Sequence, residues 1–184
     1  MQNGSWHICI FRPKKTQKSL FAYLVGKNIR KKLNCAVGMV IGVKGASIIQ
    51  SWINPSYYIG SELELPIEKL SKNYLTGGGF CNEPGYLYKN ILESILPYSY
   101  SNAIWYQGES NSNSPHDSSI YCELLKLFAC GLRKDCRDES LPLCIIQLPD
   151  IDDTVVTYVK SDLWKEVQSQ QEKAASFIDN TTFV

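Results

Sequence analysis

The sequence has almost no net charge, no long apolar run and no leader pattern, and each shortage excludes a class of protein. It has 19 basic and 18 acidic side chains and a formal charge of +1, so no strong field attracts nucleic acid or a membrane surface. No stretch approaches the ~18 apolar residues of a membrane span. Residues 1–6 are polar and lack the apolar core of a signal peptide. We therefore expect no nucleic-acid partner, no membrane and a location that leans cytoplasmic.

Metal ligands are also scarce. The 2 histidines are His7 and His116, and the 7 cysteines contain no C-x-x-C pair, so the spacing of a zinc site is missing. We predict no metal and no cofactor. Four cysteines lie in apolar runs, where thiols usually pack as small hydrophobes: Cys35, Cys122, Cys130 and Cys144. We expect most thiols to be reduced, and a disulfide among the rest stays open.

Apolar side chains recur at helical spacing in four segments and form unbroken runs in others. Helical spacing predicts helices over residues 19–33, 86–95, 118–132 and 161–177. Unbroken apolar runs are typical of strands buried on both faces of a parallel sheet. They predict strands over 37–43, 103–106 and 143–147, with another beginning at 182–184.

Strands that alternate with helices indicate a parallel sheet covered by helices on both faces. We therefore predict an α/β fold, a three-layer α/β/α sandwich, in one domain over residues 1–184. In such sheets the chemistry lies in loops beyond the carboxyl ends of the strands. Two loops qualify: residues 44–47 after the first strand, and residues 107–113 after the second.

The second of these loops contains the string Ala103-Ile-Trp-Tyr-Gln-Gly-Glu-Ser-Asn111. The string resembles the Trp-Tyr-Gln-Gly-Glu-Ser-Asn signature of sialate O-acetylesterases, which are carbohydrate esterases of the SGNH hydrolase type. The resemblance covers nearly the whole chain, and it implies a flavodoxin-like SGNH domain, incomplete at both ends, with an O-acetylated carbohydrate as substrate. Flanking segments agree in order and spacing: Phe21–Lys27, Val37–Met39, Gly45 with Ile49–Trp52, Leu87–Leu92, Leu141–Pro149, and Trp164 with Gln168 or Gln171.

The resemblance also implies roles for single residues. Ester hydrolysis requires donors aimed at the oxyanion of a tetrahedral intermediate. SGNH-type enzymes are understood to use the serine's own backbone N–H, a glycine N–H and an asparagine side chain, and the last two correspond to Gly45 and Asn111. Glycine lets the backbone approach a ligand closely, and asparagine supplies an NH₂ donor. Gln107 and Glu109 would line the sugar side or hold the shape of the loop.

The family's remaining catalytic groups have no counterpart in the sequence. Its nucleophilic serine lies in an upstream Gly-Gln-Ser-Asn motif and its histidine in a later Asp-x-x-His element, and neither string occurs here. The turn Lys44-Gly-Ala46 also departs from the family's aromatic-Gly-Gly, and Lys89 stands where asparagine is usual in the family. Two hypotheses remain. Either flanking segments or a companion chain complete an esterase, or the chain is an inactive remnant that binds a glycan or a partner.

A local catalytic triad is the alternative within the chain. The segment Gly108–Ser112 superficially resembles a nucleophile elbow, but an elbow needs glycine at its fifth position and a helix directly after it. The base would be His116, with Ser110 as nucleophile and Asp117 as the orienting carboxylate. His116 lies in a Ser-Pro-His-Asp turn and is more simply a solvated residue. We therefore predict that the isolated chain has negligible esterase activity.

Overall fold

The computed structural model describes residues 19–67, 79–96, 98–152 and 160–184. The chain divides into two compact units, residues 1–44 and residues 45–184, and each is described by itself. Within the described ranges, no helix combines the length and the apolar character that crossing a membrane requires.

The described part of the first unit contains helix α1 (Leu20–Leu33). Ser19 caps its start by accepting the N–H of Ala22 at 3.2 Å, as N-cap serines do. Asn34 ends it in the left-handed conformation at φ 49. Both boundaries agree with the predicted helix over 19–33. Ala22 is its buried residue, whereas most of its large apolar side chains are exposed.

The apolar run that follows α1 is not a strand. Residues 35–44 have no assigned secondary structure, so the predicted strand over 37–43 is wrong for this structure. A strand requires hydrogen bonds from a neighbouring strand, and α1 is the one regular element among residues 19–44. Met39 instead lies beside α1, where a Cβ on Gly26 would be 3.1 Å from its Cγ. Cys35 is exposed rather than packed.

The second unit is built on a parallel sheet with strand order β1-β2-β3. The strands are β1 (Ala103–Trp105), β2 (Leu143–Ile145) and β3 (Thr181–Phe183). The register pairs Ala103 with Leu143, and Leu143 with Thr181. The strands expected at 103–106, 143–147 and from 182 are thus confirmed to within one or two residues, and so is the α/β fold with a parallel sheet.

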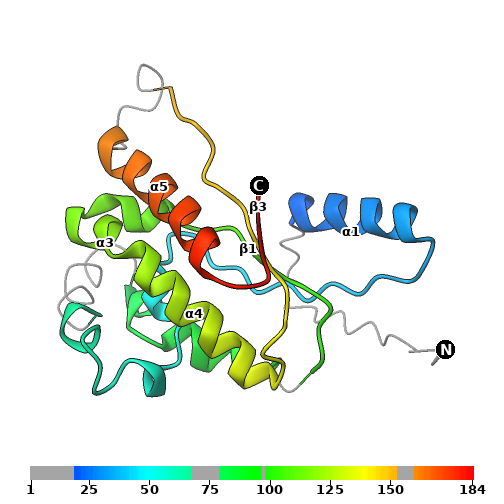
Figure 1. The fold of residues 1–184 in the computed structure, drawn as a ribbon, viewed down its shortest axis with the longest axis horizontal. Coiled ribbons are helices and arrows are strands. Elements are labelled where there is room, and N and C mark those ends of the chain that lie inside the picture. The colour runs from blue at the N-terminus through cyan, green and yellow to red at the C-terminus, as the bar shows by residue number, and fades with distance from the viewer. Residues whose placement is uncertain (1–18, 68–78, 97, 153–159) are drawn as a thin grey trace. The chain divides into compact units, whose positions relative to one another are not determined.

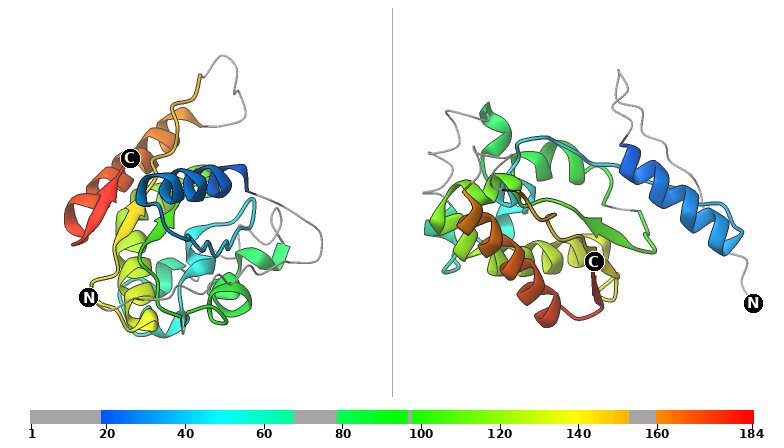
Figure 2. Two further views of the ribbon diagram at one scale, coloured as in Figure 1. Left: turned by 90° about the vertical axis from the view of Figure 1, so that its right-hand side faces the viewer. Right: turned by 90° about the horizontal axis from the view of Figure 1, so that it is seen from above.

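Among the described residues, the helices α3 (Pro115–Ser119), α4 (Tyr121–Cys136) and α5 (Ser161–Phe177) accompany this sheet. The helices α4 and α5 pack side by side (Figures 1 and 2). The helix predicted over 161–177 is confirmed at both ends. The helix predicted over 118–132 is two helices, because Ser114 and Pro115 start α3 and the backbone breaks at Ile120, with φ −100 and ψ 5.

Short helical turns connect these elements. They are η1 (Ile49–Trp52), η2 (Pro55–Tyr57), η3 (Gly79–Asn82), η4 (Tyr88–Leu92) and η5 (Glu109–Asn113). The helix predicted over 86–95 is shorter and contains the π-turn η4, where the Glu93 N–H donates to the Tyr88 carbonyl at 2.9 Å. This five-residue step widens the helix and ends its apolar periodicity.

The core of the second unit is aromatic at its centre. The indole of Trp105 meets Trp52 edge-on at 6.3 Å between ring centroids and Phe128 at 4.2 Å. Arg133 is buried at the end of α4, and its guanidinium donates to the carbonyls of Leu141 and Asp179 at 3.0 and 2.6 Å. The six described cysteines form no disulfide, and Cys35 and Cys130 are exposed, against the expectation that they pack in the core.

Candidate functional site

The signature loop leaves the carboxyl end of β1 and turns sharply at Gly108. Its φ of 153 favours glycine, and a Cβ there would be 2.9 Å from Val167 Cγ1 and 3.0 Å from Leu148 Cδ1. A side chain at this position would therefore collide with α5 and with the segment after β2. The lack of a side chain lets the loop pass close to both before η5 begins.

Asn111 lies in η5 and is fully buried. Its Oδ1 accepts the backbone N–H of Ile49 at 3.0 Å and the Nε2 of Gln107 at 2.9 Å. Its Nδ2 donates to Gln50 Oε1 at 3.0 Å. The asparagine of the signature therefore joins the loop after β1 to the η1 segment.

Gln107 holds the turn that precedes η1. Its Nε2 donates to the Ser47 carbonyl at 2.9 Å as well as to Asn111. Asn82 braces the same turn, donating to the Ala46 carbonyl at 2.9 Å and accepting the Ile48 N–H at 3.1 Å. Amide side chains from two other segments thus fix residues 46–48.

Tyr121 and Gln171 hold Gln107 from the helix side. The Tyr121 hydroxyl donates to the backbone and side-chain oxygens of Gln107, both at 2.8 Å, and accepts the indole N–H of Trp105 at 3.1 Å. Burial raises the pKa of Tyr121 far above its ordinary value, so the hydroxyl keeps its proton. Gln171 Nε2 donates to the Gln107 carbonyl at 2.9 Å.

Three side chains of α5 also fix the segment after β2. Gln171 Oε1 accepts the Leu148 N–H at 3.0 Å, and Gln168 donates to the Leu148 carbonyl at 2.8 Å. Trp164 donates to the Pro149 carbonyl at 2.9 Å. The sequence left open whether Gln168 or Gln171 accompanies Trp164, and in the structure both do.

A buried carboxylate lies behind Asn111. Asp117 is fully buried in α3, and its Oδ1 accepts Gln50 Nε2 at 2.8 Å. His116 beside it is exposed. The opposite exposure of these neighbours gives no support to a Ser110–His116–Asp117 triad.

The residues expected to form the site differ in their surroundings. Gln107 and Asn111 are buried and directly bonded. Glu109 is exposed, and its carboxylate accepts the Gly108 N–H at 3.1 Å. Gly45 is exposed, and a Cβ placed on it would meet nothing within 4 Å. The structure therefore joins two of the four and leaves open space at Gly45.

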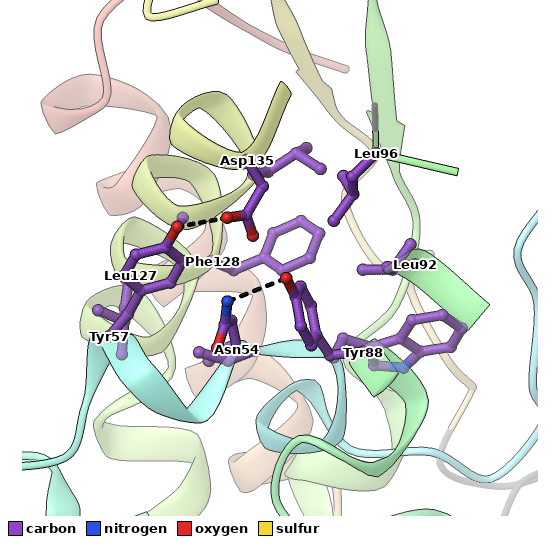
Figure 3. Close-up of a pocket in the computed structure, with 12 residues that line it drawn as sticks. Asn54, Tyr57, Tyr88, Leu92, Leu96, Leu127, Phe128 and Asp135 are labelled. Atoms are coloured by element: carbon purple, nitrogen blue, oxygen red, sulfur yellow. Dashed lines mark hydrogen bonds between the residues drawn. The ribbon is translucent and has the colours of Figure 1, made fainter. Parts of the chain in front are cut away.

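A second polar cluster lies away from the signature loop (Figure 3). Asn54 donates to the Tyr88 hydroxyl at 2.9 Å, and the Tyr57 hydroxyl donates to Asp135. Burial, followed by the hydrogen bond and charge of Asp135, raises the pKa of Tyr88 to about 12. The pocket they line has a volume of ≈ 10 Å³, room for about one water molecule. It is too small for a sugar.

Comparison with known proteins identifies the family of this chain. The family model described as carbohydrate esterase, sialic acid-specific acetylesterase, matches residues 12–184. The chain belongs to this acetylesterase family. A carbohydrate acetylesterase from Xanthomonas citri shares the fold, with a TM-score of 0.66 and 20% identity over 88% of this chain. The chain spans 33% of the length of that esterase. No curated protein matches the sequence.

For this member of the acetylesterase family, sequence reasoning missed three supports of the loop: Asn82, Asp117 and Tyr121. Asn82 lies in an irregular stretch without a pattern. Asp117 has the sequence context of a turn, and Tyr121 that of a helix core. Each acts through hydrogen bonds to another segment, which no local spacing encodes. In the described parts of the chain, no group of three or more His, Cys, Asp or Glu side chains is placed to hold a metal ion.

Proposed function

We propose that the chain provides the oxyanion-binding part of a carbohydrate O-acetylesterase site. The donors would be the backbone N–H of Gly45 and the Nδ2 of Asn111, with Glu109 toward the sugar and Gln107 holding the shape of the loop. The observation that carries the proposal is the Gln107 amide, which bonds both the Ser47 carbonyl and Asn111 Oδ1 at 2.9 Å. One side chain thus braces the turn after Gly45 against the asparagine. Oxyanion stabilisation needs donors held in this way before the reaction.

The reaction also requires groups that these residues do not supply. A serine hydroxyl must lose its proton to a base as it attacks the acetyl carbonyl, and the carbonyl electrons become the oxyanion that the donors stabilise. We propose that flanking segments or a companion chain carry that serine and base, and that O-acetylated sialic acid is the substrate.

Acetate release from O-acetylated sialic acid tests the proposal. The chain alone should show negligible turnover. Adding a companion polypeptide that carries Gly-Gln-Ser-Asn and Asp-x-x-His should restore activity. Removing one oxyanion donor costs about 10²–10³ in kcat, so Asn111→Ala should cause a loss of that order in the complemented sample. Asn113 is exposed in the same loop, and Asn113→Ala should not. Full activity in Asn111→Ala would remove Asn111 from the proposed role.

A glycan-binding remnant is the second candidate, and two observations favour it. Asn111 is fully buried, which suits a purely structural amide. An open groove of ≈ 400 Å³ lies elsewhere in the second unit, a size typical of ligand sites. Its lining offers aromatic, amide and carboxylate groups: Asn54, Tyr86, Tyr88, Asn90 and Glu93 among others. Titrating sialic acid into labelled protein should then shift backbone NMR signals of residues 83–93 and spare residues 107–111. The reverse pattern would reject this candidate.

A further inference from the structure

The Asn111 amide is constrained to act as a donor. Three of its four hydrogen-bonding positions are filled by described residues: Oδ1 by Ile49 and Gln107, and one Nδ2 hydrogen by Gln50. An amide oxygen offers two acceptor positions and an NH₂ group two donors. The fourth position is therefore an N–H, and the oxygen has no acceptor position left for a ligand.

This arrangement requires Gln50 to point its oxygen toward Asn111. An amide can rotate by half a turn and exchange its O and N with little change of shape, so packing alone does not choose the direction. With Gln50 reversed, its NH₂ would face the NH₂ of Asn111, and two donors would meet in a buried place. Something must hold the Gln50 amide in the observed direction.

Asp117 is suited to hold it. The Oδ1 of Asp117 accepts the Nε2 of Gln50 at 2.8 Å with both residues fully buried, and an accepting oxygen at this place holds the NH₂ end of the Gln50 amide toward it. Asp117 ends a series of hydrogen bonds that begins at Trp105. The Trp105 end also has a fixed direction, because an indole N–H only donates. Every link between them runs the same way: Trp105 to Tyr121, Tyr121 to Gln107, Gln107 to Asn111, Asn111 to Gln50, and Gln50 to Asp117.

We propose that Asp117 is a positioning residue. It orients Gln50 and, through Gln50, secures an acceptor for one Asn111 hydrogen, so that the one remaining position of this buried amide is a donor. Hydrogen bonds that all run in one direction polarise one another. Loss of the Asp117 carboxylate should therefore weaken bonds beyond the one that it makes to Gln50. The consequence for ester hydrolysis rests on the proposed function, whereas the direction of these hydrogen bonds does not.

The direction can be measured through the side-chain amide hydrogens of Gln50 and Asn111 by NMR hydrogen exchange. In Asp117→Ala, Gln50 loses its acceptor, and exchange at both amides should rise about fivefold, the ratio expected for one hydrogen bond of typical net strength. Asp117→Asn keeps an acceptor oxygen in the same shape, but its amide can also turn its NH₂ toward Gln50, so exchange should lie between that of Asp117→Ala and that of the parent.

Ser114→Ala is the matched control for a loosened α3. It removes the Ser114 hydroxyl that accepts the Asp117 N–H at 3.4 Å and leaves the carboxylate in place. A purely structural role of Asp117 would be seen as equal exchange in Asp117→Ala and Ser114→Ala, or as no rescue by Asp117→Asn. Either result would overturn the proposal.

The complemented esterase separates this proposal from the function. If both hold, Asp117→Ala lowers kcat several-fold with little change in KM, and Asp117→Asn recovers part of the loss. If the exchange result holds and kcat is unchanged, the positioning role stands and Asn111 is not the oxyanion donor.

Discussion

Two polar clusters of the second unit contain similar groups in different surroundings. Around Asn111, amides and a tyrosine lead to a fully buried carboxylate, Asp117. Around Tyr57 and Tyr88, an amide and two hydroxyls meet the half-buried carboxylate of Asp135. Water can replace a lost partner in the second cluster but not in the first. Burial, more than the kind of hydrogen bond, should therefore decide what each substitution costs.

The largest effect is expected from Gln50→Glu, which places a second carboxylate against Asp117. A buried charge without a compensating partner typically costs about 3–5 kcal/mol, and we expect a loss of that order in urea unfolding at pH 7. Burial and the neighbouring charge raise the pKa of the introduced carboxyl. The variant therefore keeps its full stability below the ordinary carboxyl pKa of about 4.3, and it loses stability as pH rises through the pKa of the folded state. The variant should approach the parent in acid.

Gln170→Glu also places a second carboxylate beside an acidic side chain, but at a partly exposed site. Gln170 Nε2 donates to Glu166 at 2.7 Å on the half-buried surface of α5. Like charges four residues apart on a helix cost only about 0.2–0.5 kcal/mol. Equal losses in the two variants would show that burial does not decide the cost of a second carboxylate.

Asn111→Ala should come next, with a loss of about 3 kcal/mol in urea unfolding. It leaves the Ile49 N–H, a Gln107 hydrogen and the Gln50 oxygen without their partner, and each buried unsatisfied group costs about 1–3 kcal/mol. Relaxation of the loop should keep the sum at the lower end. The exposed Asn113→Ala should stay within about 0.5 kcal/mol of the parent, and a similar loss there would point to the loop rather than to burial.

Gly108→Ala tests the close approach that brings the loop to its network. The added Cβ would lie within 3.0 Å of Val167 and Leu148 at a positive φ, and strain with overpacking should cost about 2 kcal/mol. Thermal unfolding of Gly45→Ala is the comparison, since a Cβ there meets nothing within 4 Å. A neutral Gly108→Ala would mean that the loop can shift without loss.

The smallest effect is expected from Tyr57→Phe in the half-buried cluster. It removes the hydroxyl bonded to Asp135 and should cost about 1 kcal/mol or less. Burial and Asp135 raise the pKa of Tyr57 above its ordinary 10.0. The stabilisation by the protonated Tyr57 hydroxyl is complete below pH 10 and is lost as pH rises through its pKa in the folded state. The parent should therefore lose more stability than the variant in alkaline unfolding, and parallel curves would contradict this.

Local signals predicted the limits of two helices closely. Ser19 and Asn34 set the limits of α1, and α5 was predicted at both ends from its apolar face. The strand over 37–43 failed because an apolar run describes a strand's composition and not its partner. The start of α3 was missed although Ser114 and Pro115 form an N-cap pattern, which apolar spacing alone does not detect.

The candidate site also has a part that the sequence predicted and a part that it could not predict. The signature string identified Gln107 and Asn111, which the structure joins directly. It could not reveal that Gln50 links Asn111 to Asp117, because these contacts join distant segments and depend on amide direction. Pairings of this kind emerge from the folded chain and leave no periodic trace in the sequence.

The distances along the sequence that this network spans have a kinetic consequence. Ile49 and Asn111 are 62 positions apart, and Gln50 and Asp117 are 67 apart. Closing such loops is entropically costly until other contacts hold the ends together, so these bonds should form after the folding transition state. Substitutions at Asn111 or Asp117 should then accelerate unfolding and leave the refolding rate nearly unchanged. The network would set how long the folded chain persists, and not how quickly it is reached.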